Sequence, residues 1–196
     1  MKMDMTITLL EILTFAGILI TIVIFALTYV SSKRQDRKLA HRQIYQRLEL
    51  ASIGVFQNEI DHPQLADIGL HSRNELKSKA GSLPLNAYDA YLYQQLNLFE
   101  MAYSFCREDL MPQEVFGSWV IWFGDLCALP YFRDFWIGKD AVAPLNYVPG
   151  FRKVMTVGCE IYGDESLSLQ EKRDRFFKFV GQQIDSRVVS EWLKTI

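Results

Sequence analysis

Histidine and cysteine are the residue types in this sequence that could most readily serve as catalytic groups or metal ligands. The sequence has three of each: His41, His62, His71, Cys106, Cys127 and Cys159. No histidine has the HExxH spacing or a second histidine four residues away, which would place two metal ligands on one helix face. Glycine-rich phosphate-binding motifs and the GxSxG motif of hydrolases are also missing. A pair such as Cys127 with His62 would have to form across the fold without any support from spacing. We therefore predict no enzymatic activity and no cofactor or metal site.

The three cysteines also indicate the compartment. They are odd in number, far apart and form no CxxC pair, which argues against a disulfide framework or a zinc site and suits a reducing environment. Cys106 falls in the apolar face of a helix expected over residues 85–108, so it is interpreted as a small buried hydrophobe.

One charged pair is expected to have a structural role. Glu100 falls at the margin of the apolar face of that helix, and Arg133 lies in the aromatic run of residues 130–136. An arginine among rings tends to stack its stem and aim its guanidinium at a carboxylate. We therefore predict an ion pair between Glu100 and Arg133 that fastens the short aromatic helix to the longer one. The alternative is that both face water, where a pair contributes only ~0–1 kcal/mol.

Aromatic side chains make up 13% of the sequence. So many large rings indicate a ring-packed core, an interface, or both. The candidates for these roles are Trp119, Trp122, Phe132, Phe135 and Trp136.

The N-terminal region predicts a transmembrane helix over residues 5–30, preceded by a short tail of residues 1–4. Glu11 is its only charged residue, and 19 uncharged residues follow from Ile12 to Val30. At ~1.5 Å per residue these span the ~30 Å hydrocarbon core of a bilayer. A cleaved signal peptide is the competing interpretation, but the apolar run is too long for one and lacks a small-x-small cleavage site.

Flanking charges predict the orientation of this helix. Residues 31–47 carry six basic side chains and one acidic one, Asp36. The positive-inside rule places them in the cytoplasm, with the N-terminus outside the plasma (inner) membrane. The simpler interpretation is that this cluster is only a topology signal. Its members nearest the span, Lys33, Arg34, Arg37 and Lys38, could in addition bind anionic lipid headgroups weakly, at about 1 kcal/mol per charge.

A stripe of small and hydroxylated residues runs along the predicted span. Thr14, Thr21 and Thr28 recur every seven residues, and Gly17 lies between the first two. Such a stripe lets another transmembrane helix approach closely. The alternative is that each threonine bonds back to a carbonyl of its own helix while facing lipid.

The rest of the chain predicts an all-α domain of about four to six helices in a compact cytoplasmic bundle. Residues 31–60 are expected to continue the anchor as a basic helix that enters the domain. Residues 61–196 form the soluble part, with an exposed loop at 72–83 because that segment is polar and rich in small residues. Other helices are expected near residues 85–108, 113–129, 131–137, 151–161 and 168–184.

Several short motifs resemble those of a broad family of prokaryotic proteins with one N-terminal span and a small helical cytoplasmic domain of unknown function. They are Tyr45-Gln46-Arg47-Leu48, His62-Pro63-x-Leu65, Leu98-Phe99-Glu100, Pro130-x-Phe132-Arg133-x-Phe135-Trp136 and Pro149-Gly150-Phe151. The resemblance covers residues 39–152. It implies the same architecture and no particular activity.

Two functions of different kinds remain open. The aromatic excess and the missing catalytic motifs favour an interaction module, an accessory or scaffolding subunit of a larger membrane assembly. The alternative is a membrane-tethered sensor or signalling adaptor, in which a helix continuing from membrane to domain transmits a change. The expected partners are the lipid bilayer and other transmembrane helices or a membrane complex. With a net charge of −2, nucleic acid is not expected as a partner.

Overall fold

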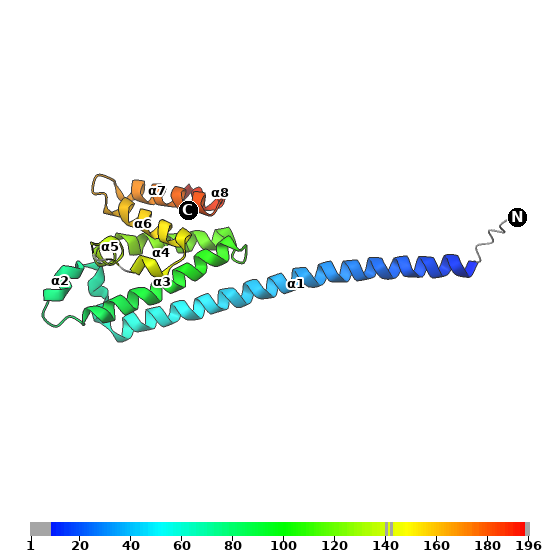
Figure 1. Ribbon diagram of the computed structural model, residues 1–196, viewed down its shortest axis with the longest axis horizontal. Helices are drawn as coiled ribbons and strands as arrows, with labels where there is room; N and C mark the ends of the chain where they lie inside the picture. Colours follow the sequence, from blue (N-terminus) through cyan, green and yellow to red (C-terminus); the bar gives the residue numbers. More distant parts are fainter. Residues whose placement is uncertain (1–8, 140, 142, 195–196) are drawn as a thin grey trace. The chain divides into compact units, whose positions relative to one another are not determined.

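The computed structural model describes residues 9–139, 141 and 143–194, apart from the side chains of residues 9–13, 34, 37, 38, 41 and 143. Within this part of the chain the regular structure is helical throughout and includes no strand, as Figure 1 shows. The all-α prediction is therefore confirmed. By their contacts the residues form two units, 1–43 and 44–196.

The first unit is the N-terminal part of helix α1 (Leu9–Asp61). Its segment Thr14–Lys33 has 20 residues, a mean hydropathy of 2.1 and no buried residue, so it is long and apolar enough to cross a membrane. The predicted tail of residues 1–4 lies outside the described residues. The whole of α1 ends at Asp61 because Pro63 follows closely, and the residue before a proline is driven out of the helical region.

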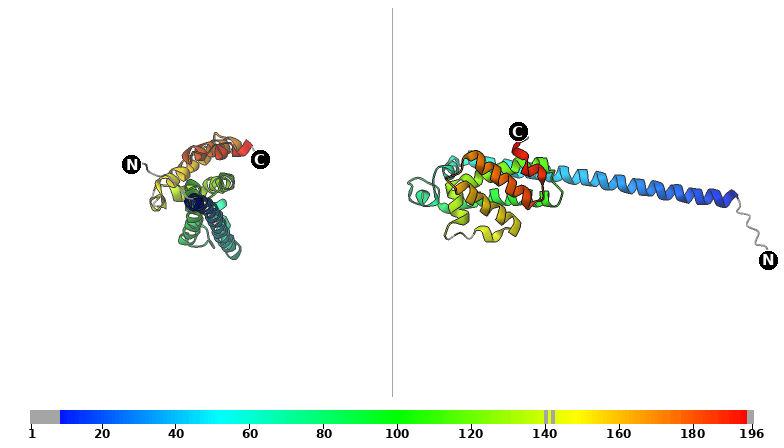
Figure 2. Two further views of the ribbon diagram at one scale, coloured as in Figure 1. Left: turned by 90° about the vertical axis from the view of Figure 1, so that its right-hand side faces the viewer. Right: turned by 90° about the horizontal axis from the view of Figure 1, so that it is seen from above.

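The second unit is a bundle whose longer helices are α3, α4, α6 and α7, in agreement with the predicted size (Figure 2). Its elements after α1 are η1 (Pro63–Gly69), α2 (Arg73–Ser78), α3 (Leu85–Arg107), α4 (Gln113–Ala128), α5 (Pro130–Ile137), η2 (Ala143–Asn146), α6 (Pro149–Gly163), α7 (Leu169–Gln183), α8 (Arg187–Ser190) and η3 (Trp192–Lys194).

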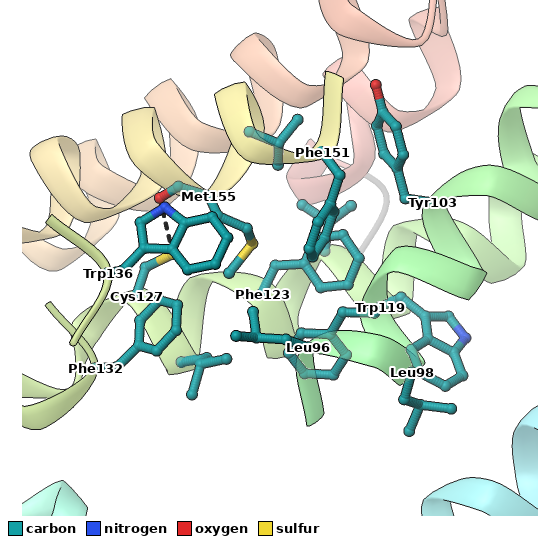
Figure 3. Close-up of a cluster of buried hydrophobic side chains, with 14 of the residues drawn as sticks. Leu96, Leu98, Tyr103, Trp119, Phe123, Cys127, Phe132, Trp136, Phe151 and Met155 are labelled. Atoms are coloured by element: carbon teal, nitrogen blue, oxygen red, sulfur yellow. Dashed lines mark hydrogen bonds between the residues drawn. The ribbon is translucent and has the colours of Figure 1, made fainter. Parts of the chain in front are cut away.

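Aromatic rings fill the core of this bundle (Figure 3). Phe123 of α4 is fully buried, and its ring centroid lies 4.8 Å from that of Phe99, 5.7 Å from that of Phe116 and 5.9 Å from that of Phe151. These rings come from α3, α4 and α6, so one aromatic cluster joins three helices.

Helices α4 and α6 approach each other closely at two glycines. A methyl group on Gly124 of α4 would lie 2.3 Å from the hydroxyl of Tyr162, and one on Gly158 of α6 would lie 2.7 Å from the sulfur of Cys127. Each glycine therefore makes room for a side chain of the facing helix, and this reciprocal arrangement fixes the α4–α6 contact.

The predicted exposed loop at residues 72–83 is wrong in its first half, which forms α2. The Ser72 side chain accepts a hydrogen bond from the Glu75 backbone N–H, and the Glu75 carboxylate accepts one from the Ser72 N–H. This capping box stabilises a helix in a segment that looks polar throughout. Leu76 fixes the short helix to the bundle, because its side chain is buried in the core.

Candidate interaction site

An apolar groove lies between the end of α1 and helices α3 and α4. Its volume is about 250 Å³. The residues that line it are Ser52, Val55, Phe56, Gln95, Leu98, Phe99, Trp122, Asp125, Leu126 and Leu129. A second hollow of about 210 Å³ adjoins it and shares Ser52 and Trp122 with it. The remaining residues of the second hollow are Tyr45, Leu48, Glu49, Val115, Ser118 and Trp119.

Trp122 lies where the two hollows meet. Its side chain is 39% exposed although the rest of α4 is largely buried. The Phe56 ring meets it edge-on at a centroid distance of 5.6 Å, and the Trp119 ring lies 5.2 Å away. Trp122 is thus a large ring in the middle of an apolar surface. The rings of Phe56 and Trp119 contact it, and the rest of it faces solvent.

The groove exists because residues 44–61 of α1 pack only lightly on the bundle. Leu48 is the one side chain of this segment that is fully buried. Polar contacts hold its C-terminal end: the Asn58 amide donates to the Gln94 side-chain oxygen at 2.6 Å, and the Tyr91 hydroxyl donates to Glu59. Partial burial raises the pKa of the Glu59 carboxyl. Apart from Leu48, only the partly buried Ile44 and Val55, the Phe56 ring and these polar bonds hold the segment, so the surfaces on either side of it are left unfilled.

The charged side chains that line the two hollows are both acidic. Glu49 and Asp125 are the only charged side chains among the residues that line the two hollows. Burial raises the pKa of Asp125, and nearby Arg173 partly offsets this effect. The site is therefore suited to an apolar group that carries a positive charge beside it.

The five aromatic residues singled out in the sequence divide into two groups. Trp119, Phe132, Phe135 and Trp136 are buried in the core, and only Trp122 faces solvent. The core role is thus confirmed for those four residues, and an interface role for Trp122 stays a prediction. Sequence reasoning missed the groove residues Phe56, Gln95 and Asp125. Phe56 lies in the helix expected over residues 31–60, but no signal marked Gln95 or Asp125.

The predicted ion pair between Glu100 and Arg133 is wrong, because each charge binds a helix end instead. The Glu100 carboxylate accepts a 2.7 Å hydrogen bond from the backbone N–H of Val148, the residue that caps the N-terminus of α6. The Arg133 guanidinium donates to the carbonyls of Ala128 and Cys127 at the C-terminus of α4. The Glu100 carboxylate therefore lies at the positive end of one helix dipole, and the Arg133 guanidinium lies at the negative end of another.

The contacts of Arg133 stabilise a sharp corner in the chain. Helices α4 and α5 meet at an angle of 86°, with Pro130 starting the second helix. The corner leaves the last carbonyls of α4 without helical partners, and Arg133 satisfies two of them from the first turn of α5.

The stripe on the candidate span is exposed along its length. The Thr21 hydroxyl donates to the Gly17 carbonyl and the Thr28 hydroxyl to the Ile24 carbonyl, each at 2.8 Å. A methyl group on Gly17 would meet no atom within 4 Å. Hydrogen bonds from threonine hydroxyls to carbonyls of their own helix can form whether the stripe faces lipid or packs against another helix. Helix packing by Thr14, Gly17, Thr21 and Thr28 therefore stays a prediction.

The proposed headgroup-binding residues are only partly described. Lys33 is exposed, and its ammonium lies 5.1 Å from the centroid of the Tyr29 ring. The side chains of Arg34, Arg37 and Lys38 lie outside the described part of the structure. Lipid binding by this group stays a prediction.

The three cysteines are free and buried. Burial raises the pKa of the Cys106 thiol to about 11. Burial also raises the pKa of Cys127, which lies beside Cys159. Thiols with raised pKa values have little of the thiolate form that reacts, so the interpretation of Cys106 as a buried hydrophobe is supported. Among the described residues no three His, Cys, Asp or Glu side chains are grouped as metal ligands would be.

Comparisons of the chain with family models, curated proteins and solved structures found no match. The family resemblance of residues 39–152 therefore stays a prediction, and the functional argument depends on the groove and on the apolar N-terminal helix.

Proposed function

We propose that this chain is a membrane-anchored helical interaction module, an accessory or scaffolding subunit of a larger membrane assembly. The segment Thr14–Lys33 would stay in the plasma (inner) membrane as a single span, with the N-terminus outside. The bundle would lie in the cytoplasm, because six basic residues follow the apolar stretch.

The observation that carries this proposal is the exposed Trp122 between two apolar hollows. Tryptophan is among the residues most enriched at binding hot spots, where truncation costs ~2 kcal/mol or more. A ring held on one side by Phe56 and Trp119 is already ordered, so a partner loses little side-chain entropy by binding it. Glu49 and Asp125 at the same surface favour a partner with basic side chains near its apolar contact.

The test is purification of the full chain from its native membranes in mild detergent, comparing Trp122→Ala with a matched variant. Val188→Ala is a suitable control because Val188 is 38% exposed, much like Trp122, and lies on α8 away from the groove. We expect the wild type and Val188→Ala to retain the same stoichiometric partner and Trp122→Ala to lose it. The proposal fails if all three proteins purify alone, or if Trp122→Ala keeps the partner.

A sensor or signalling adaptor is the second candidate, and the shape of the groove is what favours it. The 250 Å³ volume is large enough for a small apolar molecule, which would touch α1, α3 and α4 together. Because α1 is also the helix that contains the apolar stretch, a ligand there would contact the element that leads to the membrane. Mass spectrometry of the intact purified protein would distinguish the two functions: a bound small molecule and no protein partner would favour the sensor.

A further inference from the structure

A second apolar surface lies on the outer side of α1, away from the groove. Leu50, Ile53 and Ile60 are 69%, 54% and 71% exposed. At 100° per residue they share one side of the helix, roughly opposite the buried Leu48. In Figure 1 this part of α1 runs along α3, and no other element of the bundle covers its opposite side. Large aliphatic side chains on an uncovered helix face usually mark an interface.

We propose that this stripe joins two copies of the chain through a short parallel coiled coil of residues 50–60. The proposal depends on membrane anchorage but not on the groove, so it is separate from the binding of a partner at Trp122.

The spacing of the stripe is that of a coiled-coil seam. Leu50, Ile53, Gln57 and Ile60 follow one another at intervals of three, four and three residues, which are the a and d positions of a heptad repeat. Gln57 is the one polar residue at an a position. A single polar residue there reduces stability but favours a defined register.

The anchor explains why a second copy is the occupant. Every copy inserted through the positive-inside rule has the same orientation, and residue 50 follows the span by the same number of residues in each. Two copies in one bilayer therefore present the stripe in parallel and in register, which a soluble partner would not do.

The charged residues beside the seam permit parallel pairing of the two helices and indicate where the paired segment begins. In a parallel pair each g position faces the next e position of the other helix. Glu49 would face Gly54 of the second copy, and Phe56 would face Asp61, so no like charges meet. One heptad earlier Arg42 would face Arg47, and this repulsion disfavours pairing before Leu50.

The size of the seam indicates that it pairs only copies anchored in the same bilayer. A stable soluble interface buries roughly 800 Å² on each partner, which is more than four side chains on one helix face can supply. Confining both copies to one membrane raises their effective concentration toward ~mM, where a weak seam is sufficient. We therefore expect pairing that depends on the protein-to-lipid ratio.

Cysteine cross-linking of the full chain in liposomes tests the seam directly. The native cysteines are buried, so the wild type provides the background. We compare Ile53→Cys, at a d position, with Ala51→Cys, which is also exposed but lies at the flanking b position. Side chains at d positions meet across a parallel pair, so Ile53→Cys should form a disulfide-linked dimer about tenfold faster. Equal rates for the two variants, or no dimer above the wild type, would overturn the proposal.

Two further variants separate this surface from the groove. Leu50→Glu places a charge in the seam at an exposed position, so it should abolish the Ile53→Cys cross-link without unfolding the bundle. Trp122→Ala should leave the cross-link unchanged while removing any groove-bound partner. Persistence of the cross-link with Leu50→Glu, or its loss with Trp122→Ala, would contradict a seam on the outer face of α1.

Discussion

Replacing Arg133 by methionine measures how strongly its guanidinium stabilises the corner between α4 and α5. The guanidinium donates to the Ala128 and Cys127 carbonyls, with the longer bond at 3.5 Å. A hydrogen bond to a charged group contributes ~1.5–3 kcal/mol, and a cation at a helix C-terminus adds ~0.3–1 kcal/mol. Methionine keeps the apolar stem, and water can reach part of the site. We therefore expect Arg133→Met to lower the free energy of unfolding by about 2 kcal/mol.

Glu100→Gln should have a much smaller effect. A glutamine oxygen can still accept the hydrogen bond from the Val148 N–H, so only the charge at the N-terminus of α6 is lost. That charge contributes ~0.3–1 kcal/mol. Since the two side chains bind different helix ends, the double variant should show the sum of the two losses, with a coupling below about 0.5 kcal/mol.

Urea unfolding of the full chain in a mild detergent, followed by tryptophan fluorescence, supplies the four values of this double-mutant cycle. Arg175→Met, at an exposed position on α7, controls for the loss of a positive charge and should change stability by less than about 0.5 kcal/mol. A coupling of 1.5 kcal/mol or more would show that Glu100 and Arg133 do interact. An Arg133→Met protein as stable as the control would show that the α4 carbonyls do not need the guanidinium.

Four further predictions follow from other contacts. Gly158→Ala should destabilise the bundle by ~1–3 kcal/mol because its methyl would lie 2.7 Å from a buried sulfur, whereas Gly54→Ala, with no atom within 4 Å, should stabilise it by ~0.5–1 kcal/mol; urea unfolding compares them. Burial raises the pKa of Glu59 above 4.5, so attachment of residues 44–61 should be strongest below pH 4.5 and weaken as the pH rises through the raised pKa. Hydrogen exchange corrected for intrinsic rates should show this trend, and Glu59→Gln should remove it. A reporter fused to the C-terminus should read cytoplasmic, and an external signal would refute the topology. If the threonine stripe packs, Gly17→Leu should weaken helix association in membranes by ~1–2 kcal/mol while Ala26→Leu does not; equal behaviour would mean that the stripe faces lipid.

The helices that sequence reasoning predicted well are those with a strong apolar period or a proline at their start. The helix α3 begins at Leu85 and ends at Arg107, close to the predicted 85–108, because its apolar face is continuous. Helix α5 begins at Pro130, one residue before the predicted start, and ends at Ile137, directly before Gly138. The missed helix α2 has no apolar period, yet its Ser72 and Glu75 spacing is a capping box that could have been recognised.

The groove and the contacts of the two charges could not be predicted, since they depend on which helix ends lie near each other. Residue type showed that Arg133 needs a partner, but carbonyls at a helix C-terminus are acceptors that every helix offers. In the same way, Trp119 and Trp122 are three residues apart on one helix, yet the first is buried against Phe99 of α3 and the second is exposed beside Phe56 of α1. Residue type and spacing do not distinguish them.

The light attachment of residues 44–61 has a mechanical consequence. A pull on the apolar N-terminal stretch would load this segment first, because the segment joins that stretch to the rest of the domain. Its contacts run in series along the helix, from Leu48 to the Phe56–Trp122 ring pair and then the Asn58–Gln94 bond. Peeling would break them one at a time, at a lower force than shearing them together. Detachment of the segment would uncover Leu98, Phe99 and Leu126, which line the groove beneath it.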